Sequence, residues 1–278
     1  RYKTHASRIV YPCYVQPKLN GVRAIYSHSA DLCEQWQTHS RSTKELRFWN
    51  PSILAHITEQ LQPLFKSENN VILDGELYHH GWSLQRISGA VSWNRGEPST
   101  ATMAIEYHIF DVVADVPFRE RAEALRQLRS FYPHVVPTHY VGSQVSSEHF
   151  YSRWKRERFE GMVYRHPDRP YGFAERCGNQ ENRWDYIIKR KDFSSAEFPI
   201  VGIKEERDQF DRPKGRCGAL RLETESGTTF TAGSGLNDDQ RERYWRDPPV
   251  GKIATIEYEM YSDDGVPLKP IVGQVHEE

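Results

Sequence analysis

The 278-residue sequence lacks a long hydrophobic run, and its mean hydropathy is −0.75. A helix that crosses a bilayer needs about 18 consecutive apolar residues, so we expect no membrane span. The first residues also lack the basic and apolar stretches of a secretion signal. We therefore expect a cytoplasmic protein. The chain begins at Arg1 rather than Met, which leaves open a removed upstream signal and a periplasmic location.

Cysteine is scarce. The four thiols, Cys13, Cys33, Cys177 and Cys217, form no Cys-x-x-Cys pair. This spacing excludes a four-thiolate zinc site, and a disulfide framework is uncommon in a chain of this length. Internal repeats and low-complexity linkers are absent as well. By contrast, aromatic residues make up 12% of the sequence, enough to fill hydrophobic cores and to exclude wholesale disorder.

The chain has almost no net charge, with a formal total of −1 and a pI near 6.9. The balance hides an asymmetry, because residues 1–193 carry +5 and residues 194–278 carry −6. Opposite signs favour a domain boundary here and assign any polyanion-binding face mainly to the first part. In the second part, Arg212, Lys214 and Arg216 form the only basic patch that we expect to face DNA. A near-neutral protein would have to bind a duplex through such local patches.

Strands and helices are mixed in the first part, which predicts an α+β domain. Amphipathic spacing predicts helices over 52–65, 118–131 and 146–159, the last with Ser146 or Ser147 as its N-cap. Apolar runs predict strands, including VILDGELY and ATMAIEYHIFDVV. After residue 193 the helices thin out, and five short strands with one helical insert predict a small barrel of the OB type.

Four stretches carry residues suited to phosphate chemistry. Lys18 begins a Lys-x-x-Gly turn, and Asp74 and Glu76 share one face of a strand, where they could hold a divalent metal. Glu160 opens another strand. Lys189 and Lys191 point the same way from an apolar strand, a costly arrangement unless an anion lies between them. Each stretch alone has a plain alternative: an exposed turn lysine, an acidic strand end or a solvated strand end.

Six stretches then occur in a fixed order: PKLNGVRA, SRSTKE, LDGELY, YHIFDVV, EGMVYR and IIKRKDF. Together they resemble the covalent nucleotidyltransferase superfamily, specifically the minimal ATP-dependent DNA ligases of phages, large viruses and some bacteria. The resemblance covers nearly the whole chain. It implies an adenylation domain of antiparallel sheets with helices over 1–193 and an OB-fold domain over 194–278. An RNA ligase or an mRNA-capping nucleotidyltransferase is the alternative, which SRSTKE and LDGEL disfavour.

The resemblance also implies an activity, the sealing of nicks in duplex DNA through a lysyl-AMP and then an AMP-DNA intermediate. Lys18 would attack ATP, Phe110 would stack on the adenine, and Lys189 and Lys191 would offset charge on the α-phosphate. The implied cofactor-binding residues are Gln16, Lys18, Arg23, Glu76, Phe110, Glu160, Lys189 and Lys191. Glu76 and Glu160 would also hold Mg²⁺ or Mn²⁺. The implied DNA-binding residues are Arg23, Arg41, Arg176 and Arg183, with nicked double-stranded DNA as the partner. Taken alone, Phe110 also fits plain strand core, and Arg41 also fits a solvated loop.

The sequence departs from the family pattern at two positions. Asn20 stands where the family's lysine motif has Asp, and Leu268 stands where an arginine is expected after Pro267. Lys269 is the nearest cation that could orient the pyrophosphate, although Lys is not equivalent to Arg. These departures motivate a second alternative, a protein that binds nicks without catalysis. No coiled coil or large apolar stripe calls for a partner chain, so we expect a monomer.

Overall fold

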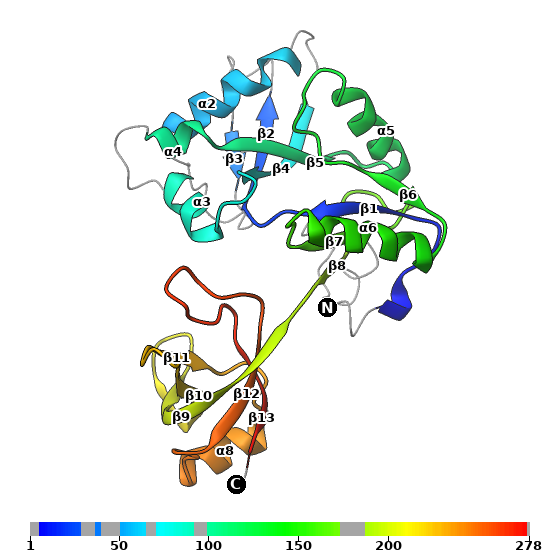
Figure 1. The fold of residues 1–278 in the computed structure, drawn as a ribbon. Helices are drawn as coiled ribbons and strands as arrows, with labels where there is room; N and C mark the ends of the chain where they lie inside the picture. The colour runs from blue at the N-terminus through cyan, green and yellow to red at the C-terminus, as the bar shows by residue number, and fades with distance from the viewer. Residues whose placement is uncertain are drawn as a thin grey trace. The chain divides into compact units, whose positions relative to one another are not determined.

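The computed structural model describes residues 6–28, 37–39, 51–64, 71–91, 99–172 and 187–276. By its internal contacts the chain divides into two compact units, Arg1–Lys191 and Asp192–Glu278. Figure 1 shows mixed sheets and helices in the first unit and mainly strands in the second. The α+β class expected for the first part and the OB-like class expected for the second are both confirmed.

The first sheet of the first unit has the strand order β6-β1-β7-β8, and all its pairs are antiparallel. Its strands are β1 (Cys13–Lys18), β6 (His139–Val141), β7 (Gly161–Arg165) and β8 (Ile187–Lys191), and the 3₁₀ helix Ala6–Arg8 precedes β1. Helix α6 (Gln144–Arg156) packs Tyr151 and Trp154 against Val15 and its neighbours. Helix α6 lies along one face of this sheet (Figure 1), and Gln16 and Lys18, which alternate with Val15 along β1, point to the opposite face.

The second sheet has the antiparallel order β3-β2-β4-β5. Its strands are β2 (Val22–His28), β3 (Gln37–His39), β4 (Val71–Tyr78) and β5 (Glu106–Val112). The helices of this region are α2 (Pro51–Leu61), which continues as the 3₁₀ helix Gln62–Leu64, then α3 (Leu84–Val91), α4 (Thr100–Met103) and α5 (Phe118–Leu128). Ile53, Ile57 and Leu61 recur every four residues on α2 and are fully buried, which confirms the helix predicted from their spacing.

Two local predictions are wrong. The stretch ATMAIEYHIFDVV was expected to form one strand, but its start belongs to α4, and β5 begins only at Glu106. Ser99 and Thr102 form a capping box that starts this short helix. Helix α6 also begins earlier than expected, with Ser143 as its N-cap instead of Ser146 or Ser147. In both cases a side chain three residues along completes the cap, a local hydrogen-bonding signal that apolar periodicity does not contain.

The second unit is a five-stranded antiparallel sheet in the order β11-β10-β9-β12-β13. Its strands are β9 (Ser194–Arg207), β10 (Pro213–Glu223), β11 (Thr229–Ala232), β12 (Ile253–Tyr258) and β13 (Ile271–Val275), and α8 (Asp238–Arg246) is the helical insert. Ser234, just after β11, forms a bridge with Ile271 of β13. This bridge joins the two edges of the sheet, as closure into a barrel requires.

Cys13 and Cys217 are free, buried thiols. Burial raises the pKa of Cys13 to about 12, which makes it a poor nucleophile. Cys33 and Cys177 lie outside the described residues, as does the SRSTKE stretch with its Arg41. Among the described helices, none has the length and apolar character needed to cross a membrane.

Candidate active site

Strand register places three of the predicted lysines on one face of the first sheet. Lys18 of β1 pairs with Gly161 of β7, and Gly161 pairs in turn with Lys191 of β8. Lys189 lies two residues before Lys191, so its side chain leaves the same face. Residues far apart in the chain are therefore brought together by pairing alone, because side chains at directly paired positions point to the same side.

Glu160 joins two of these lysines. Lys18 Nζ donates a hydrogen bond to one oxygen of the Glu160 carboxylate, and Lys191 Nζ donates to the other oxygen at 3.4 Å. The Glu160 backbone N–H also donates to the Lys18 carbonyl at 3.0 Å. Only 6% of the Glu160 side chain is exposed, and two ammonium groups compensate its buried charge. The neighbouring Gly161 permits this close pairing, since a Cβ there would lie 2.1 Å from the Arg190 carbonyl oxygen.

Glu76 of β4 approaches the same lysines from the second sheet. Its carboxylate accepts a hydrogen bond from the Gly21 N–H at 3.2 Å. Burial raises the pKa of Glu76 to about 7, against the opposing effects of Lys18, the Gly21 N–H and Lys189. The Lys-x-x-Gly turn needs its glycine because a Cβ at Gly21 would lie 2.3 Å from the Leu77 carbonyl oxygen.

The carboxylates of Glu76 and Glu160 thus both interact with Lys18, one from each sheet. Carboxylate oxygens are hard donors of the kind that Mg²⁺ and Mn²⁺ prefer. The donor set therefore fits the divalent ion that the sequence implied, and the neighbouring lysines supply positive charge for phosphate groups. Lys18, Glu76, Glu160, Lys189 and Lys191 form what we call the lysine cluster.

Arg23 lies opposite Glu76 in the β2–β4 register, but its guanidinium is bound by two other residues. Its Nε and Nη2 donate to the two oxygens of Asp74 at 2.8 and 2.6 Å, and Nη2 also donates to the Tyr171 hydroxyl at 3.0 Å. The Tyr171 hydroxyl in turn donates to Asp74 at 2.7 Å. Asp74 is 2% exposed. It therefore anchors Arg23 in a bidentate pair, the geometry in which Arg and a carboxylate interact most strongly. Asp74, which the sequence suggested as a metal ligand, thus already has both carboxylate oxygens bound to Arg23.

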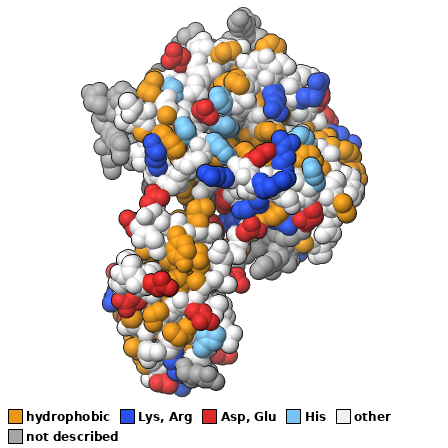
Figure 2. All heavy atoms as spheres, viewed as in Figure 1, with side chains coloured by type: hydrophobic (Ala, Val, Ile, Leu, Met, Phe, Trp, Pro, Cys, Tyr) orange, Lys and Arg blue, Asp and Glu red, His pale blue; other side chains and the backbone are white. Residues whose placement is uncertain are grey.

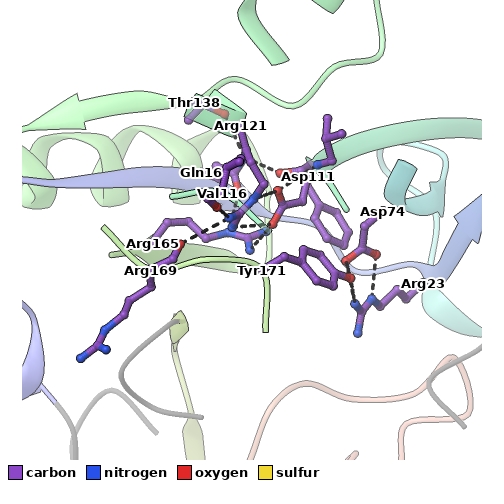
Figure 3. A network of polar contacts seen from close by, with 12 residues as sticks. Gln16, Arg23, Asp74, Asp111, Val116, Arg121, Thr138, Arg165, Arg169 and Tyr171 are labelled. Carbon is purple, nitrogen blue, oxygen red and sulfur yellow. Dashed lines mark hydrogen bonds and ion pairs between the residues drawn. The ribbon is translucent and has the colours of Figure 1, made fainter. Parts of the chain in front are cut away.

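A buried charge network holds Gln16 next to this pair (Figure 3). Asp111 of β5 accepts from Arg121 Nε at 2.8 Å and from Arg165 Nη1 at 3.0 Å. Arg165 Nε donates to the Gln16 side-chain oxygen at 3.0 Å. Complete burial raises the pKa of Asp111, while the two guanidinium groups oppose that shift. The network ties β1, β5, β7 and α5 together beneath the site.

Gln16 and Phe110 lie side by side, but the Gln16 amide is already engaged. Its Nε2 donates to the Phe110 carbonyl and to Thr138 Oγ1, both at 2.9 Å, and the residue is 1% exposed. The Phe110 ring is partly buried against the core, with the Arg165 guanidinium 5.5 Å from its centre. Gln16 therefore positions the strand that carries Phe110, and both hydrogens of its amide group are committed to protein acceptors.

The remaining predicted residues lie elsewhere. Lys269 belongs to the second unit, where its Nζ donates to Glu259 at 2.7 Å and the side chain is 65% exposed. In the same unit Lys214 and Arg216 both pair with Glu206, and Arg212 pairs with Asp208. The expected basic patch therefore carries its own acidic partners. Arg41, Arg176 and Arg183 lie outside the described residues.

Sequence reasoning did not identify Arg121, Arg165, Asp111 or Tyr171 as parts of the site. One signal was present, because Arg121 stands on the buried side of α5 between Phe118 and Leu125. A charged residue inside an apolar stripe is rarely buried without a partner. The partner, Asp111 of β5, could not be identified from the sequence, since the apolar pattern contains no signal that links residue 121 to residue 111.

Two family models match the chain. Residues 4–181 match the model described as ATP dependent DNA ligase domain, and residues 211–275 match the DNA ligase OB-like domain. A DNA ligase of African swine fever virus, strain Badajoz 1971 Vero-adapted, is 26% identical over 197 residues, which cover 67% of this chain and 43% of that protein. The DNA ligase of isolate Pig/Kenya/KEN-50/1950 is 25% identical with the same coverage. The chain thus spans less than half the length of the curated relatives that it matches.

Solved structures show the same architecture. One, from "DNA binding with a minimal scaffold: Structure-function analysis of Lig E DNA ligases", has a TM-score of 0.71 and 21% identity, covering 98% of this chain and 96% of that chain. Another, named Pmar-Lig_PreS3, has a TM-score of 0.78 and 19% identity, covering 99% of this chain and 66% of that chain. At such low identity these likenesses show the fold alone.

Proposed function

Because the chain belongs to the ATP-dependent DNA ligase family, whose domain model matches residues 4–181, we propose that it seals nicks in duplex DNA. The substrates are ATP and a nick with a 5′-phosphate and a 3′-hydroxyl. The observation that supports this proposal most strongly is the lysine cluster, in which Lys18 lies between two carboxylates and close to two further lysines. Phosphoryl transfer depends on such positioning and charge compensation more than on unusual side chains.

Lys18 is the proposed nucleophile. Its Nζ forms a bond to the α-phosphorus of ATP while the bond from that phosphorus to the pyrophosphate oxygen breaks. The attacking amine must be neutral, so the ammonium loses one proton to solvent before the attack, and Nζ loses a second proton as the N–P bond forms. The Glu160 carboxylate accepts a hydrogen bond from Nζ in the resting protein and is placed to hold that proton. Lys189 and Lys191 then offset the charge that grows on the α-phosphate.

Two further transfers complete the proposed reaction. The 5′-phosphate of the nick attacks the phosphorus of lysyl-AMP and releases Lys18, which gives AMP-DNA. The 3′-hydroxyl then attacks the 5′-phosphorus, loses its proton and expels AMP, so the strand is sealed. Lys189 and Lys191 are proposed to act in both displacements as well, because in each one negative charge grows on a phosphate that lies beside the lysine cluster. A divalent ion on Glu76 and Glu160 would neutralise phosphate charge in these steps.

The nucleotide and DNA contacts are assigned by position. Phe110 is proposed to stack on the adenine, supported by Gln16, while Lys269 is proposed to orient the pyrophosphate. Arg23, Arg41, Arg176 and Arg183 are proposed to bind phosphates of the nick or of AMP. DNA binding would then rest on backbone contacts and fall steeply with salt. We propose a monomer that acts in the cytoplasm, of the host if the chain is viral.

The test is incubation with α-³²P-ATP and Mg²⁺ followed by a denaturing gel, for wild type, Lys18→Ala and the control Lys204→Ala. Lys204 is an exposed lysine of the second unit. We expect a labelled protein band in wild type and in the control, and none in Lys18→Ala. A band in Lys18→Ala would show that another residue is the nucleophile.

A second arm identifies the polynucleotide. Labelled protein, freed of ATP, is offered a DNA nick or an RNA nick, and α-³²P-GTP replaces ATP in a parallel reaction. Transfer of label to the 5′ end of the DNA nick followed by sealing is the expected result. Labelling by GTP, or transfer only to RNA, would instead favour the capping or RNA-ligase alternative. An unlabelled wild type that still binds nicked duplex would favour the non-catalytic binder.

A further inference from the structure

Three metal-ligating side chains meet on the first unit outside the lysine cluster. Glu106 and His108 lie two residues apart on β5 and so point to the same face, and His134 follows α5. One ligand atom from each of the three residues lies within 4.8 Å of the others. Glu106 Oε2 accepts from His108 Nε2 at 2.9 Å and lies 3.4 Å from His134 Nδ1.

The backbone holds His134 in this position. Ile109 of β5 donates to the His134 carbonyl at 2.9 Å, and Val136 donates back to the Ile109 carbonyl at 2.8 Å. Ile109 and Val135 accordingly form a parallel bridge. His134 is therefore fixed beside β5 by main-chain hydrogen bonds, independently of its own ring. A preorganised ligand loses less conformational freedom when an ion binds.

We propose that Glu106, His108 and His134 bind one divalent transition-metal ion of borderline softness, with Zn²⁺ as the foremost candidate. Imidazole nitrogens with one carboxylate oxygen form a donor set that suits zinc. Around a tetrahedral Zn²⁺ with bonds of about 2.0–2.1 Å, neighbouring ligand atoms are about 3.3 Å apart. The present separations of 2.9 and 3.4 Å are close to that spacing. All three side chains are partly exposed, so an ion can enter and a water molecule can fill the fourth position.

This site differs from the carboxylate pair of the lysine cluster. Glu76 and Glu160 offer oxygens alone, which suits Mg²⁺, whereas two imidazoles disfavour Mg²⁺. The two ligand sets share no residue, although His108 stands directly opposite Glu76 in the β4–β5 register. A Zn²⁺ ion here would clamp the segment around His134 to β5, the strand that carries Phe110 and Asp111.

The test uses the full chain without a histidine tag, stripped of metal by a chelator, and titrates it with Zn²⁺ and with Co²⁺ as a spectroscopic probe. The variants are His134→Ala and Glu106→Gln, which leave His108 beside Glu76 unchanged. The matched control is His149→Ala, an exposed histidine on α6. We expect wild type and the control to bind about one Zn²⁺ more per chain than His134→Ala, with affinity in Glu106→Gln reduced by about 100-fold. Co²⁺ in wild type should give visible d–d bands that Mg²⁺ does not displace.

Equal Zn²⁺ stoichiometry and affinity in wild type and His134→Ala would overturn the proposal. Misfolding is excluded separately, because the metal-free variants should match metal-free wild type in circular dichroism and in thermal unfolding. On adding Zn²⁺, wild type and His149→Ala should then gain thermal stability, Glu106→Gln should gain less and His134→Ala should gain none. In parallel, each metal-stripped protein, including His134→Ala, is incubated with α-³²P-ATP and Mg²⁺. The covalent labelling measures the proposed ligase activity independently of Zn²⁺ binding. Absence of labelling in every protein would count against the ligase proposal and leave the zinc result intact.

Discussion

The two units treat charge in opposite ways. The first unit buries Asp74, Asp111, Arg121 and Arg165, each at most 5% exposed. Among the described residues of the second unit, Thr224 is the only buried polar residue. The ion pairs that Glu206 and Asp208 form in this unit are accessible to solvent. On the face shown in Figure 2, Lys and Arg side chains gather on the first unit, whereas Asp and Glu are prominent on the second.

This difference distinguishes charge that positions a site from charge that keeps a surface solvated. Removing two charges from water costs several kcal/mol, so a buried pair is weak evidence for stability. In the first unit, however, buried charged residues hydrogen-bond to Gln16 and to Arg23 beside the lysine cluster and so position both side chains. Exposed pairs contribute little to the free energy of unfolding and are screened by salt.

The largest effect is expected from breaking the buried network. Asp111→Asn leaves Arg121 and Arg165 without their carboxylate in a fully buried position. The free energy of unfolding of the first unit should fall by about 3–5 kcal/mol, measured by urea denaturation. Asp263→Asn, at an exposed position of the second unit, is the control for the substitution itself. If Asp111→Asn lowered the free energy of unfolding no more than the control does, the buried network would not contribute to the stability of the first unit.

The next largest effect concerns pH. The pKa of Glu76 is about 7 in the folded protein, against 4.5 for a glutamate in the unfolded chain. Protonated Glu76 therefore contributes stability that is fully present below pH 4.5. This contribution is lost as pH rises through 7. In metal-free protein, wild type should therefore lose roughly 3 kcal/mol relative to Glu76→Gln between pH 4.5 and pH 8. Urea denaturation of both proteins at several pH values measures this difference. Parallel pH profiles would show that Glu76 titrates normally.

A smaller effect is expected to be shared by both units. Ser143 caps α6 and Asn237 caps α8, each through a reciprocal capping box. Ser143→Ala and Asn237→Ala should each lower the free energy of unfolding of their own unit by about 1 kcal/mol. The contrast between the units would then lie in buried charge and not in local capping. Ser152→Ala, at an exposed position inside α6, is the control, and a loss confined to one unit would contradict the expectation.

The smallest effect is expected at the surface of the second unit. Lys214 donates to Glu206 at 2.7 Å, and its side chain is 40% exposed. Lys214→Gln should leave the midpoint of thermal unfolding within the scatter of repeated measurements at both low and high salt. The same variant reports on DNA binding, since loss of a phosphate contact would weaken binding to nicked duplex and reduce its salt dependence. A large loss of thermal stability in Lys214→Gln would contradict this expectation and would mean that the Lys214–Glu206 pair stabilises the fold as strongly as a buried ion pair.

Local pattern predicted much of the fold. The spacing of Ile53, Ile57 and Leu61 predicted α2, and the apolar run VILDGELY predicted β4 with Glu76 on it. The start of β5 was predicted wrongly because a Ser99–Thr102 capping box competes with strand formation there. Capping depends on a few hydrogen bonds, which hydrophobic periodicity does not report.

The sequence by itself determined which chemical groups the chain carries and how each sits in its own segment. Alternation along a strand puts Lys189 and Lys191 on one side of that strand. Only the tertiary structure decided that Glu160 reaches Lys18, that Arg165 reaches Asp111 and that His134 reaches Glu106. These pairs are brought together by strand register and helix packing, because contacts between distant segments depend on the whole fold and leave no local signature.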